Sequence, residues 1–325
     1  MQQQPSILIA SSVYDRPCIE HVIALLEARG CKVVLFNSDE VANGTAQFSI
    51  YIDRSGEAHI MYQNKKLKPA EIGAAWYRRP NVFGLDETPL RAYSMNREYQ
   101  DLQRFLWDSI PIKVWLNAPT HMRAHNNKLS QLLLARSLGF AIPETMVSNR
   151  WDEVTALKDA LLTFKMPSGG VIYNEMGEAR TMCSTTLSNN LDTLPTKTLP
   201  YPGIWQQHIT KRREWRVTVV GKQYFSMAIY TSDQAKDDWR KHQTDHQLVQ
   251  FVVEPFPDML GKKCCEFVKR CDLKYGAFDF IEEPDGKIVF LEMNPNGQFL
   301  KLEGPTMPVS RAIANELARI ANKRR

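Results

Sequence analysis

The sequence has no long apolar run, no CxxC pair and no GxGxxG fingerprint. An uninterrupted apolar stretch of about 18 residues is absent, so we expect no transmembrane helix. The N-terminal segment MQQQPSILIASS has neither a basic region nor a long apolar core, and it therefore predicts no secretory signal. The six cysteines follow no zinc-like spacing, which favours free thiols in a reducing compartment. These absences predict a cytoplasmic protein.

The charge balance is only mildly basic, with a formal net charge of +5. Basic and aromatic residues are not interleaved, so we expect no nucleic-acid partner. A basic cleft for an anionic ligand or an acidic peptide fits this charge equally well. With 43% hydrophobic and 24% charged residues in 325, the chain is long enough for two or three globular domains.

The first third of the chain predicts a compact α/β domain, residues 1–118. An apolar strand, a helix opened by Pro17 and closed by Gly30, and a second strand form a βαβ unit over 7–36. FSIYI and AHIMY predict a hairpin, and GAAWYRRP predicts a short strand that ends in two arginines. A polar helix follows over roughly 88–108.

The remainder predicts two further segments, 119–199 and 200–325, so that the fold class is α/β or α+β with three domains in series. The middle segment predicts helices in NNKLSQLLLARSLGF and WDEVTALKDALL and a strand in LLTFKM, and its proline-rich end TLPTKTLPYPG marks a boundary near residue 200. The last segment predicts the strand IWQQHI, a hairpin over EWRVTVVGKQYFSMAIY, a helix over PDMLGKKCCEFVKRCDL, and the strands KYGAFDFIEE and KIVFLEMN.

Oxygen-bearing side chains gather at the end of the last predicted strand, FLEMNPNGQF. Strand alternation places Glu292 and Asn294 on one face, and pairing across the turn at Asp285 places Asp279 roughly opposite Glu292. Two carboxylates and an amide oxygen suit Mg²⁺ whose octahedron is completed by nucleotide phosphates. A solvated acidic strand face explains the same residues, and both interpretations stay open at this point.

Two lysines are candidates for phosphate contacts. Lys165 precedes Ser-Gly-Gly, whose glycines allow backbone N–H groups to approach a ligand closely, and Lys128 lies at the start of a predicted helix. Each lysine alone fits a solvated surface position. Only the order of these lysines and the later motifs along the chain indicates a function.

That order resembles the ATP-grasp superfamily: Lys128, Lys165 with its glycines, WQQHI, EWRVTVVG, FDFIEE and FLEMNPNGQF. The resemblance covers about residues 118–303, and the N-terminal βαβ unit fits the first domain of that superfamily. More narrowly, WYRRP, EWRVTVVG, DWRK and LEMNPNGQFLKLE resemble the ligases that macrocyclise graspetides, the microviridin-type peptides with side-chain ester or amide crosslinks. Lys301 departs from this pattern, because the family often has an aromatic residue there.

The resemblance implies a role for each matching residue. ATP and Mg²⁺, in two ions, are the implied cofactors. Lys128 and Lys165 would hold phosphates, and Gln206 would contact the adenine. Gln207 and Ile209 would supply hinge backbone groups, and Glu214 would lie near the ribose. Asp279, Glu292 and Asn294 would bind the metal ions, with Glu292 bridging, while Arg216 and Arg240 would receive the substrate carboxylate.

The implied activity is closure of ester or amide rings between Asp or Glu and Thr, Ser or Lys side chains of a precursor peptide that has a leader and an acidic, Thr/Ser-rich core. The resemblance also implies a homodimer. A RimK-like or glutathione-synthetase-like ligase shares the ATP machinery and stays open as an alternative. A nucleotide-binding regulator without turnover is the alternative of another class.

Overall fold

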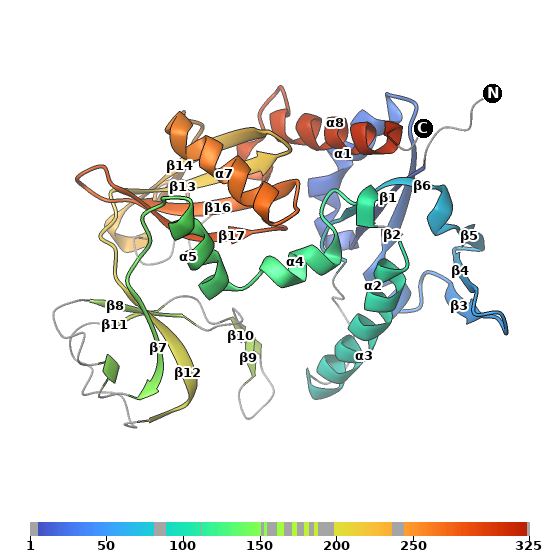
Figure 1. The fold of residues 1–325 in the computed structure, drawn as a ribbon, viewed down its shortest axis with the longest axis horizontal. Coiled ribbons are helices and arrows are strands. Elements are labelled where there is room, and N and C mark those ends of the chain that lie inside the picture. The colour runs from blue at the N-terminus through green and yellow to red at the C-terminus, as the bar shows by residue number, and fades with distance from the viewer. Residues whose placement is uncertain are drawn as a thin grey trace.

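The computed structural model shows a mixed α/β chain whose strands form several small sheets (Figure 1). The residues that the structure describes are 6–80, 89–110, 112–150, 153–154, 161–165, 171–173, 179–181, 185–187, 198–235 and 244–323. The mixed α/β class agrees with the sequence, whereas the division into three domains stays a prediction. No helix of the described ranges combines the length and apolar character needed to cross a membrane.

The N-terminal part is built on a parallel sheet with strand order β2-β1-β6. Its strands are β1 (Ser6–Ser11), β2 (Lys32–Asn37) and β6 (Ile72–Tyr77), and β1 is buried along most of its length. Helix α1 (Arg16–Glu27) covers one face, and the end of α3 (Pro89–Asp108) contributes to the core on the other. The predicted βαβ unit is confirmed.

A small antiparallel sheet, β3-β4-β5, lies at the far end of this part in Figure 1. It contains β3 (Phe48–Ile52), β4 (Ala58–Tyr62) and β5 (Lys65–Leu67), and it follows the short helix α2 (Ser38–Ala42). The register pairs Phe48 with Tyr62, which confirms the predicted hairpin.

The middle of the chain forms a four-stranded sheet with order β11-β8-β12-β7, reached through helices α4 (Pro119–His125) and α5 (Lys128–Ser137). Its strands are β7 (Thr145–Arg150), β8 (Leu162–Lys165), β11 (Thr185–Leu187) and β12 (Thr198–Gln207); β9 (Val171–Tyr173) and β10 (Ala179–Thr181) form a separate pair. The expected helix over 151–162 lies mostly outside the described residues.

Strand β12 runs through residue 200, where the proline-rich segment predicts a boundary. Its pairing with β7 is irregular between Thr198 and Gly203, the stretch that contains Pro200 and Pro202. Proline has no N–H for a ladder hydrogen bond, so the irregularity lets the strand accommodate both prolines. The strand that carries WQQ therefore belongs to the sheet of β7 and β8.

The C-terminal part is a five-stranded antiparallel sheet with order β15-β14-β13-β16-β17. Its strands are β13 (Arg213–Val220), β14 (Gln223–Thr231), β15 (Val249–Val252), β16 (Tyr275–Glu282) and β17 (Ile288–Asn294). Helix α7 (Asp258–Arg270) buries Phe267 and Cys264 in the core on one face. The predicted hairpins and helix of this segment are confirmed.

The sequence analysis missed the last helix, α8 (Pro308–Asn322). Its buried residues include Val309, Ile313 and Leu317, which recur at helical spacing and could have identified it. This helix lies beside α1 at the top of Figure 1 and shares one core with both the N-terminal sheet and the five-stranded sheet. It therefore ties the two ends of the chain together.

Candidate nucleotide and metal site

The predicted metal ligands lie on one face of the five-stranded sheet. The register pairs Arg216 of β13 with Asp279 of β16, and Asp279 in turn with Glu292 of β17. Residues directly opposite each other on neighbouring strands share a face, so these three side chains form a row across the sheet. Glu214 and Asn294 are two residues away along their strands and share this face. The predicted juxtaposition of Asp279 and Glu292 is confirmed, while their role as ligands stays a prediction.

Cationic side chains lie next to the acids of this row. Arg216 Nε is 3.0 Å from Asp279 Oδ1, and Lys128 Nζ is 3.5 Å from Glu292 Oε2. Lys211 Nζ is 2.5 Å from Glu214 Oε1. The face therefore combines carboxylates that suit a metal ion with cations that suit phosphate or carboxylate groups.

Helix α5 places Lys128 through its first turn. The side chain of Asn127 caps this helix by accepting a hydrogen bond from Ser130 N at 3.0 Å. The buried Gln131 side chain pairs with the backbone of Met293, accepting from its N–H at 2.9 Å and donating to its carbonyl at 2.7 Å. Because β17 is an edge strand, Gln131 occupies backbone groups that a further strand would otherwise pair with, and it fixes α5 beside Glu292.

The turn after β17 returns toward Arg216. Asn294 Oδ1 accepts a hydrogen bond from Asn296 N at 2.8 Å, which closes the turn directly after the strand. A Cβ on Gly297 would lie 2.3 Å from Ala277 Cβ and 3.2 Å from Arg216 Nη1. Only glycine fits this approach, so the turn backbone packs directly against the sheet beside Arg216.

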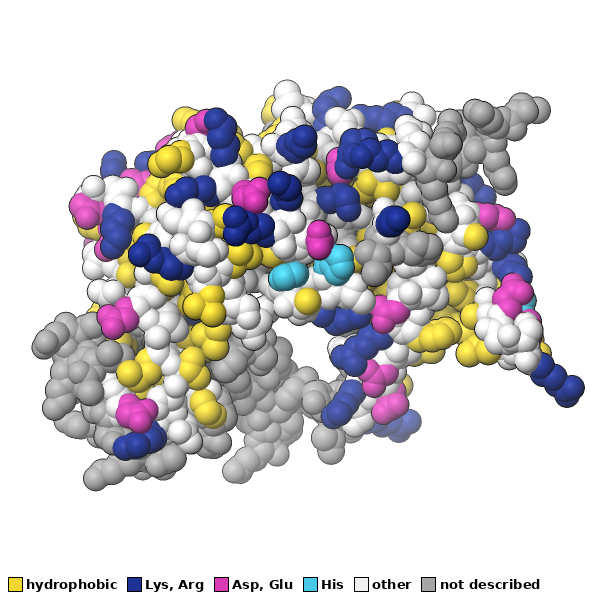
Figure 2. All heavy atoms as spheres, viewed as in Figure 1, with side chains coloured by type: hydrophobic (Ala, Val, Ile, Leu, Met, Phe, Trp, Pro, Cys, Tyr) yellow, Lys and Arg dark blue, Asp and Glu magenta, His cyan; other side chains and the backbone are white. Residues whose placement is uncertain are grey.

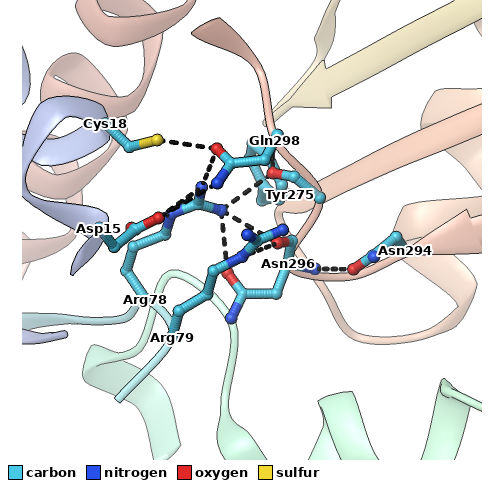
Figure 3. Close-up of polar contacts among 9 residues, drawn as sticks. Asp15, Cys18, Arg78, Arg79, Tyr275, Asn294, Asn296 and Gln298 are labelled. Atoms are coloured by element: carbon cyan, nitrogen blue, oxygen red, sulfur yellow. Dashed lines mark hydrogen bonds and ion pairs between the residues drawn. The ribbon is translucent and has the colours of Figure 1, made fainter. Parts of the chain in front are cut away.

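Arg78, the first arginine of WYRRP, anchors this turn to the N-terminal sheet (Figure 3). Its side chain is fully buried, and Nε lies 2.8 Å from Asp15 Oδ2. Nη1 donates to the carbonyls of Asn296 and Gly297 at 3.0 and 2.9 Å, and Nη2 donates to Gln298 Oε1 at 2.7 Å. No role was predicted for Arg78 from the sequence pattern, although an arginine directly after a buried strand indicates a buried partner.

The residues predicted for the nucleotide base lie on β12 and after its end. Gln206 is buried and donates to Thr145 Oγ1 at 3.0 Å, and Ile209 is buried. The N–H of Gln207 donates to the Glu144 carbonyl at 3.0 Å, so a backbone contact from Gln207 to a nucleotide would come from its carbonyl oxygen. An apolar cavity of about 510 Å³ borders Gln207, and among its described lining residues Gln207 is the one predicted for the nucleotide.

Lys165 ends β8, opposite Ile204 of β12, and Gln206 is opposite Thr163. Cross-strand partners share a face, so Lys165 and Gln206 lie on the same face of the four-stranded sheet. The glycines that follow Lys165 lie outside the described residues, as does Arg240 within 236–243. The structure thus groups Glu214, Arg216, Asp279, Glu292 and Asn294 on one sheet, with Lys128 of α5 beside them, and Lys165 and Gln206 on another sheet.

The donor set fits Mg²⁺. Two carboxylates and one amide oxygen converge at the end of β16 and β17, and Mg²⁺ prefers oxygen ligands of this kind. Histidine and cysteine, which would favour a softer metal, are absent from this described group. The residues present therefore suit a hard cation that also contacts phosphate.

Comparisons with known proteins agree with this chemistry. The family model for the MvdD pre-ATP grasp domain matches residues 6–123. The RiPP-associated ATP-grasp ligase of Chryseobacterium gregarium, solved with ADP and a leader and core peptide, matches with a TM-score of 0.82 and 26% identity over 97% of both chains. No curated protein sequence matches the chain.

Two further solved structures are similar. The macrocyclase MdnC of Microcystis aeruginosa MRC, bound with its precursor peptide MdnA, has a TM-score of 0.79 and 29% identity over 97% of this chain and 99% of that chain. PsnB, solved with Mg, ADP and a precursor variant, is 17% identical with a TM-score of 0.71 over 98% and 99%, and it shows likeness of fold alone. The chain is therefore similar to ATP-grasp ligases, in particular to the MvdD-type and MdnC-type macrocyclases and to RiPP-associated ATP-grasp ligases.

Proposed function

We propose that the protein closes ester or amide rings within a ribosomal precursor peptide. A side-chain carboxylate oxygen of Asp or Glu attacks the γ-phosphorus of ATP, ADP leaves, and an acyl-phosphate forms. A Thr or Ser hydroxyl or a Lys amine of the same peptide then attacks the acyl carbon and gives up its proton, and phosphate leaves. Each ring removes one water from the peptide and converts one ATP to ADP and phosphate.

The observation that carries the proposal is the row formed by Arg216, Asp279 and Glu292. It places a nearly buried guanidinium beside two carboxylates on the same face of a sheet. A peptide carboxylate must be held next to a γ-phosphate of like charge, and a guanidinium can hold it through two parallel hydrogen bonds. A ligase that had to orient only ATP would not need this arginine beside the metal ligands.

The remaining roles are those that the resemblance to ATP-grasp ligases implies. Asp279, Glu292 and Asn294 would hold two Mg²⁺ ions, which neutralise charge on the transferring phosphoryl group when bound. Lys128 and Lys165 hold phosphate oxygens, Gln206, Gln207 and Ile209 contact the base, and Glu214 contacts the ribose end. Arg216 and Arg240 orient the carboxylate. Catalysis then rests on positioning and electrostatics rather than on a covalent enzyme intermediate.

Mass spectrometry of a co-expressed precursor tests this activity. The partner is a short peptide encoded beside the gene, with repeats rich in Thr, Ser, Asp and Glu, and each closed ring lowers its mass by 18 Da. Arg216→Ala should keep ADP binding and lose at least about tenfold of the ring closure, since truncating one partner of a buried charge pair costs ~2–5 kcal/mol. A complete set of 18 Da losses in Arg216→Ala would contradict the assigned role of this residue.

The same assay separates the alternatives. A RimK-like or glutathione-synthetase-like ligase would raise the mass of its acceptor by joining a free amino acid, and a regulator would release no ADP with any peptide. The homodimer also remains a proposal, and sedimentation velocity tests it: a single 37.3 kDa species at micromolar concentration would contradict it.

A further inference from the structure

Arg79, the second arginine of WYRRP, has an unusual backbone conformation. Its φ is +50°, in the left-handed region that residues with a Cβ enter at a cost in free energy. Gln63 and Asn64 also have positive φ, but they form the two-residue turn between β4 and β5, a turn type that requires it. No hairpin turn explains Arg79, which directly follows β6 and the buried Arg78. The fold holds this residue in a conformation that its local sequence does not favour.

The charge of Arg79 is not compensated in the way that the charge of Arg78 is. Asp15 lies 2.8 Å from Arg78, whereas Arg79 Nε donates to the neutral carbonyl of Asn296 at 3.2 Å. Within the part of the chain that the structure describes, no ion pair joins Arg79 to a carboxylate. Burial lowers the pKa of the half-buried Arg79 guanidinium, and the adjacent charge of Arg78 lowers it further. A cation that has lost part of its water in this way is stabilised by an anion.

Arg79 adjoins a cavity without being one of its described lining residues: Pro80 follows it in the chain, and Asn296 accepts its hydrogen bond. Figure 3 shows its guanidinium beside that of Arg78, next to the turn that carries Asn294 and Asn296. Both asparagines, together with Pro80, line a cavity of about 320 Å³ between this turn and helices α3 and α4. Asn294 is also a proposed metal ligand. A ligand in the cavity therefore lies at the border of the site for Mg²⁺ and nucleotide.

The charged residues that line the cavity are basic. Its described lining residues include Arg104 and Arg123 and neither Asp nor Glu. The acids that pair with these arginines, Asp101 and Asp108, are not among the lining residues. Figure 2 accordingly shows basic and acidic side chains mixed over α3. The charged groups that an oxyanion would meet among the described lining residues are these two arginines, each of which also pairs with an acid outside the lining.

We infer that Arg79 binds an oxyanion of the reaction, and specifically the side-chain carboxylate of the acidic peptide substrate. This inference rests on the proposed function. It adds a third arginine, from the N-terminal sheet, to the carboxylate contacts of Arg216 and Arg240. The γ-phosphate of the nucleotide is the other oxyanion that a guanidinium at this position would bind. The cavity favours the peptide, because residues of α3 and α4 line it and none of its described lining residues belongs to β8 or β12, which carry the predicted nucleotide residues.

Arg79→Gly is the decisive variant, because glycine adopts positive φ without strain and removes the cation. The probe is a fluorescein-labelled peptide of four Thr-Glu-Ser-Asp repeats, compared with a matched peptide that has Gln and Asn in place of Glu and Asp. Anisotropy is measured with ADP and Mg²⁺ present. The wild-type protein should prefer the acidic peptide, and Arg79→Gly should reduce this preference by about tenfold while keeping the melting temperature and the affinity for ADP.

Asn64→Gly is the matched control, because it makes the same replacement at another left-handed position, remote from the site. It should leave both peptide affinities unchanged. An Arg79→Gly protein that keeps the acidic preference overturns the inference, and one that loses affinity for ADP instead assigns Arg79 to the nucleotide and overturns the peptide assignment. If the wild-type protein closes no ring on any precursor but still shows the Arg79-dependent preference, the proposed function fails while the binding role stands.

Discussion

Two charged clusters occupy opposite faces of the five-stranded sheet, and they contain the same kinds of residues. The metal-face cluster consists of Arg216, Asp279, Glu292 and Lys128, and the Glu282 cluster consists of Glu282, Arg213, Trp215, Tyr230 and Glu254. Residues 213 and 216 of β13 differ by an odd number, as do 279 and 282 of β16, so strand alternation directs the clusters to opposite sides. Arg216 with Asp279 and Arg213 with Glu282 therefore come from the same strand pair, β13 and β16, and the other partners of each cluster come from neighbouring elements.

The Glu282 cluster is closed. Glu282 Oε2 accepts hydrogen bonds from Arg213 Nε at 2.8 Å and Trp215 Nε1 at 2.7 Å. Arg213 Nη1 continues to Tyr230 and Glu254, at 2.6 and 2.7 Å. Burial by itself raises the pKa of Glu282, but the hydrogen bonds from Arg213 and Trp215 outweigh it, and the net pKa is lowered. Such a network holds β13, β14 and the segment after β15 together.

The metal-face cluster is open at one end. The side chains of Lys128 and Glu292 are 27% and 33% exposed; Glu292 lies near the end of the edge strand β17, and Lys128 begins helix α5. At this exposure the ion pair is worth little, because solvent screens it. Charged side chains of similar types therefore stabilise the fold where they are enclosed, and they can exchange partners where they contact solvent.

The largest effect should come from breaking the closed cluster. Glu282→Ala leaves the Trp215 N–H and part of the Arg213 charge without their acceptor in a buried position, and removing one partner of a buried pair costs about 3–5 kcal/mol. Urea unfolding should show this loss of stability. Turnover per folded molecule should stay close to that of the wild-type protein. A loss below about 1 kcal/mol would place Glu282 among ordinary surface pairs.

Glu292→Ala should behave in the opposite way. Removing the proposed bridging ligand should lower the rate of turnover, measured as ADP formed, by at least about 100-fold, since a bound metal ion contributes several kcal/mol of charge stabilisation. The free energy of unfolding should change by less than about 1 kcal/mol, because the pair with Lys128 is partly exposed. Glu266→Ala on α7, an exposed acid that pairs with Arg270, is the control and should change neither quantity.

Gly297→Ala perturbs the metal face through its backbone. The added Cβ would lie 2.3 Å from Ala277 Cβ, so the turn must move, and overpacking of this kind costs about 1–3 kcal/mol. The displaced turn should weaken the affinity for Mg²⁺, measured as the Mg²⁺ dependence of ADP release. Gly286→Ala, at a turn where a Cβ meets nothing within 4 Å, should lower stability without altering this dependence.

Lys165→Ala removes one proposed phosphate contact. Calorimetry should show an affinity for ADP lower by about tenfold, ~1.4 kcal/mol, with ring closure restored at saturating ATP. An affinity equal to that of the wild-type protein would remove Lys165 from the nucleotide site.

The smallest effect should be on the pH dependence of the melting temperature, which distinguishes the enclosed Glu282 from the more exposed Glu266. A carboxylate whose folded-state pKa is lowered stabilises the fold fully above its unfolded pKa, and this contribution is lost as pH falls through the lowered value. For Glu282 the loss therefore begins below the ordinary glutamate range near pH 4.5. Glu282→Gln should flatten the fall in melting temperature between pH 5 and 3. The pKa of Glu266 is also lowered, but solvent screens its ion pairs, so Glu266→Gln should flatten the fall in melting temperature less.

Local patterns in the sequence were sufficient for the hairpin that carries Asp279 and Glu292. Alternation and the count from the Pro284-Asp285-Gly286 turn bring Asp279 to within one residue of the position opposite Glu292, and an irregularity in the pairing next to Asp279 places the two residues directly opposite each other. The buried cluster around Arg78 could not be found in this way. Arg78 contacts Asp15, which is 63 residues away, and Gln298, which is 220 residues away, and no periodicity relates such positions.

The domain boundary near residue 200 stays a prediction, although strand β12 runs through this position. Proline-rich segments usually separate domains, but an irregular strand tolerates Pro200 and Pro202 where its ladder is interrupted. Helix α8 had a readable apolar spacing, and overlooking it concealed the element that joins both ends of the chain.

The most direct test of the metal-face cluster is a calorimetric titration of ADP into the wild-type protein and into Glu292→Gln, each with Mg²⁺ and with the ion removed by EDTA. If Asp279, Glu292 and Asn294 hold Mg²⁺ against the nucleotide, the wild-type affinity should fall at least about tenfold on removal of the ion, ~1.4 kcal/mol. Glu292→Gln should have the lower affinity when Mg²⁺ is present and should lose this difference when the ion is removed. Equal Mg²⁺ dependence in the two proteins would show that the ion binds elsewhere and would contradict the account.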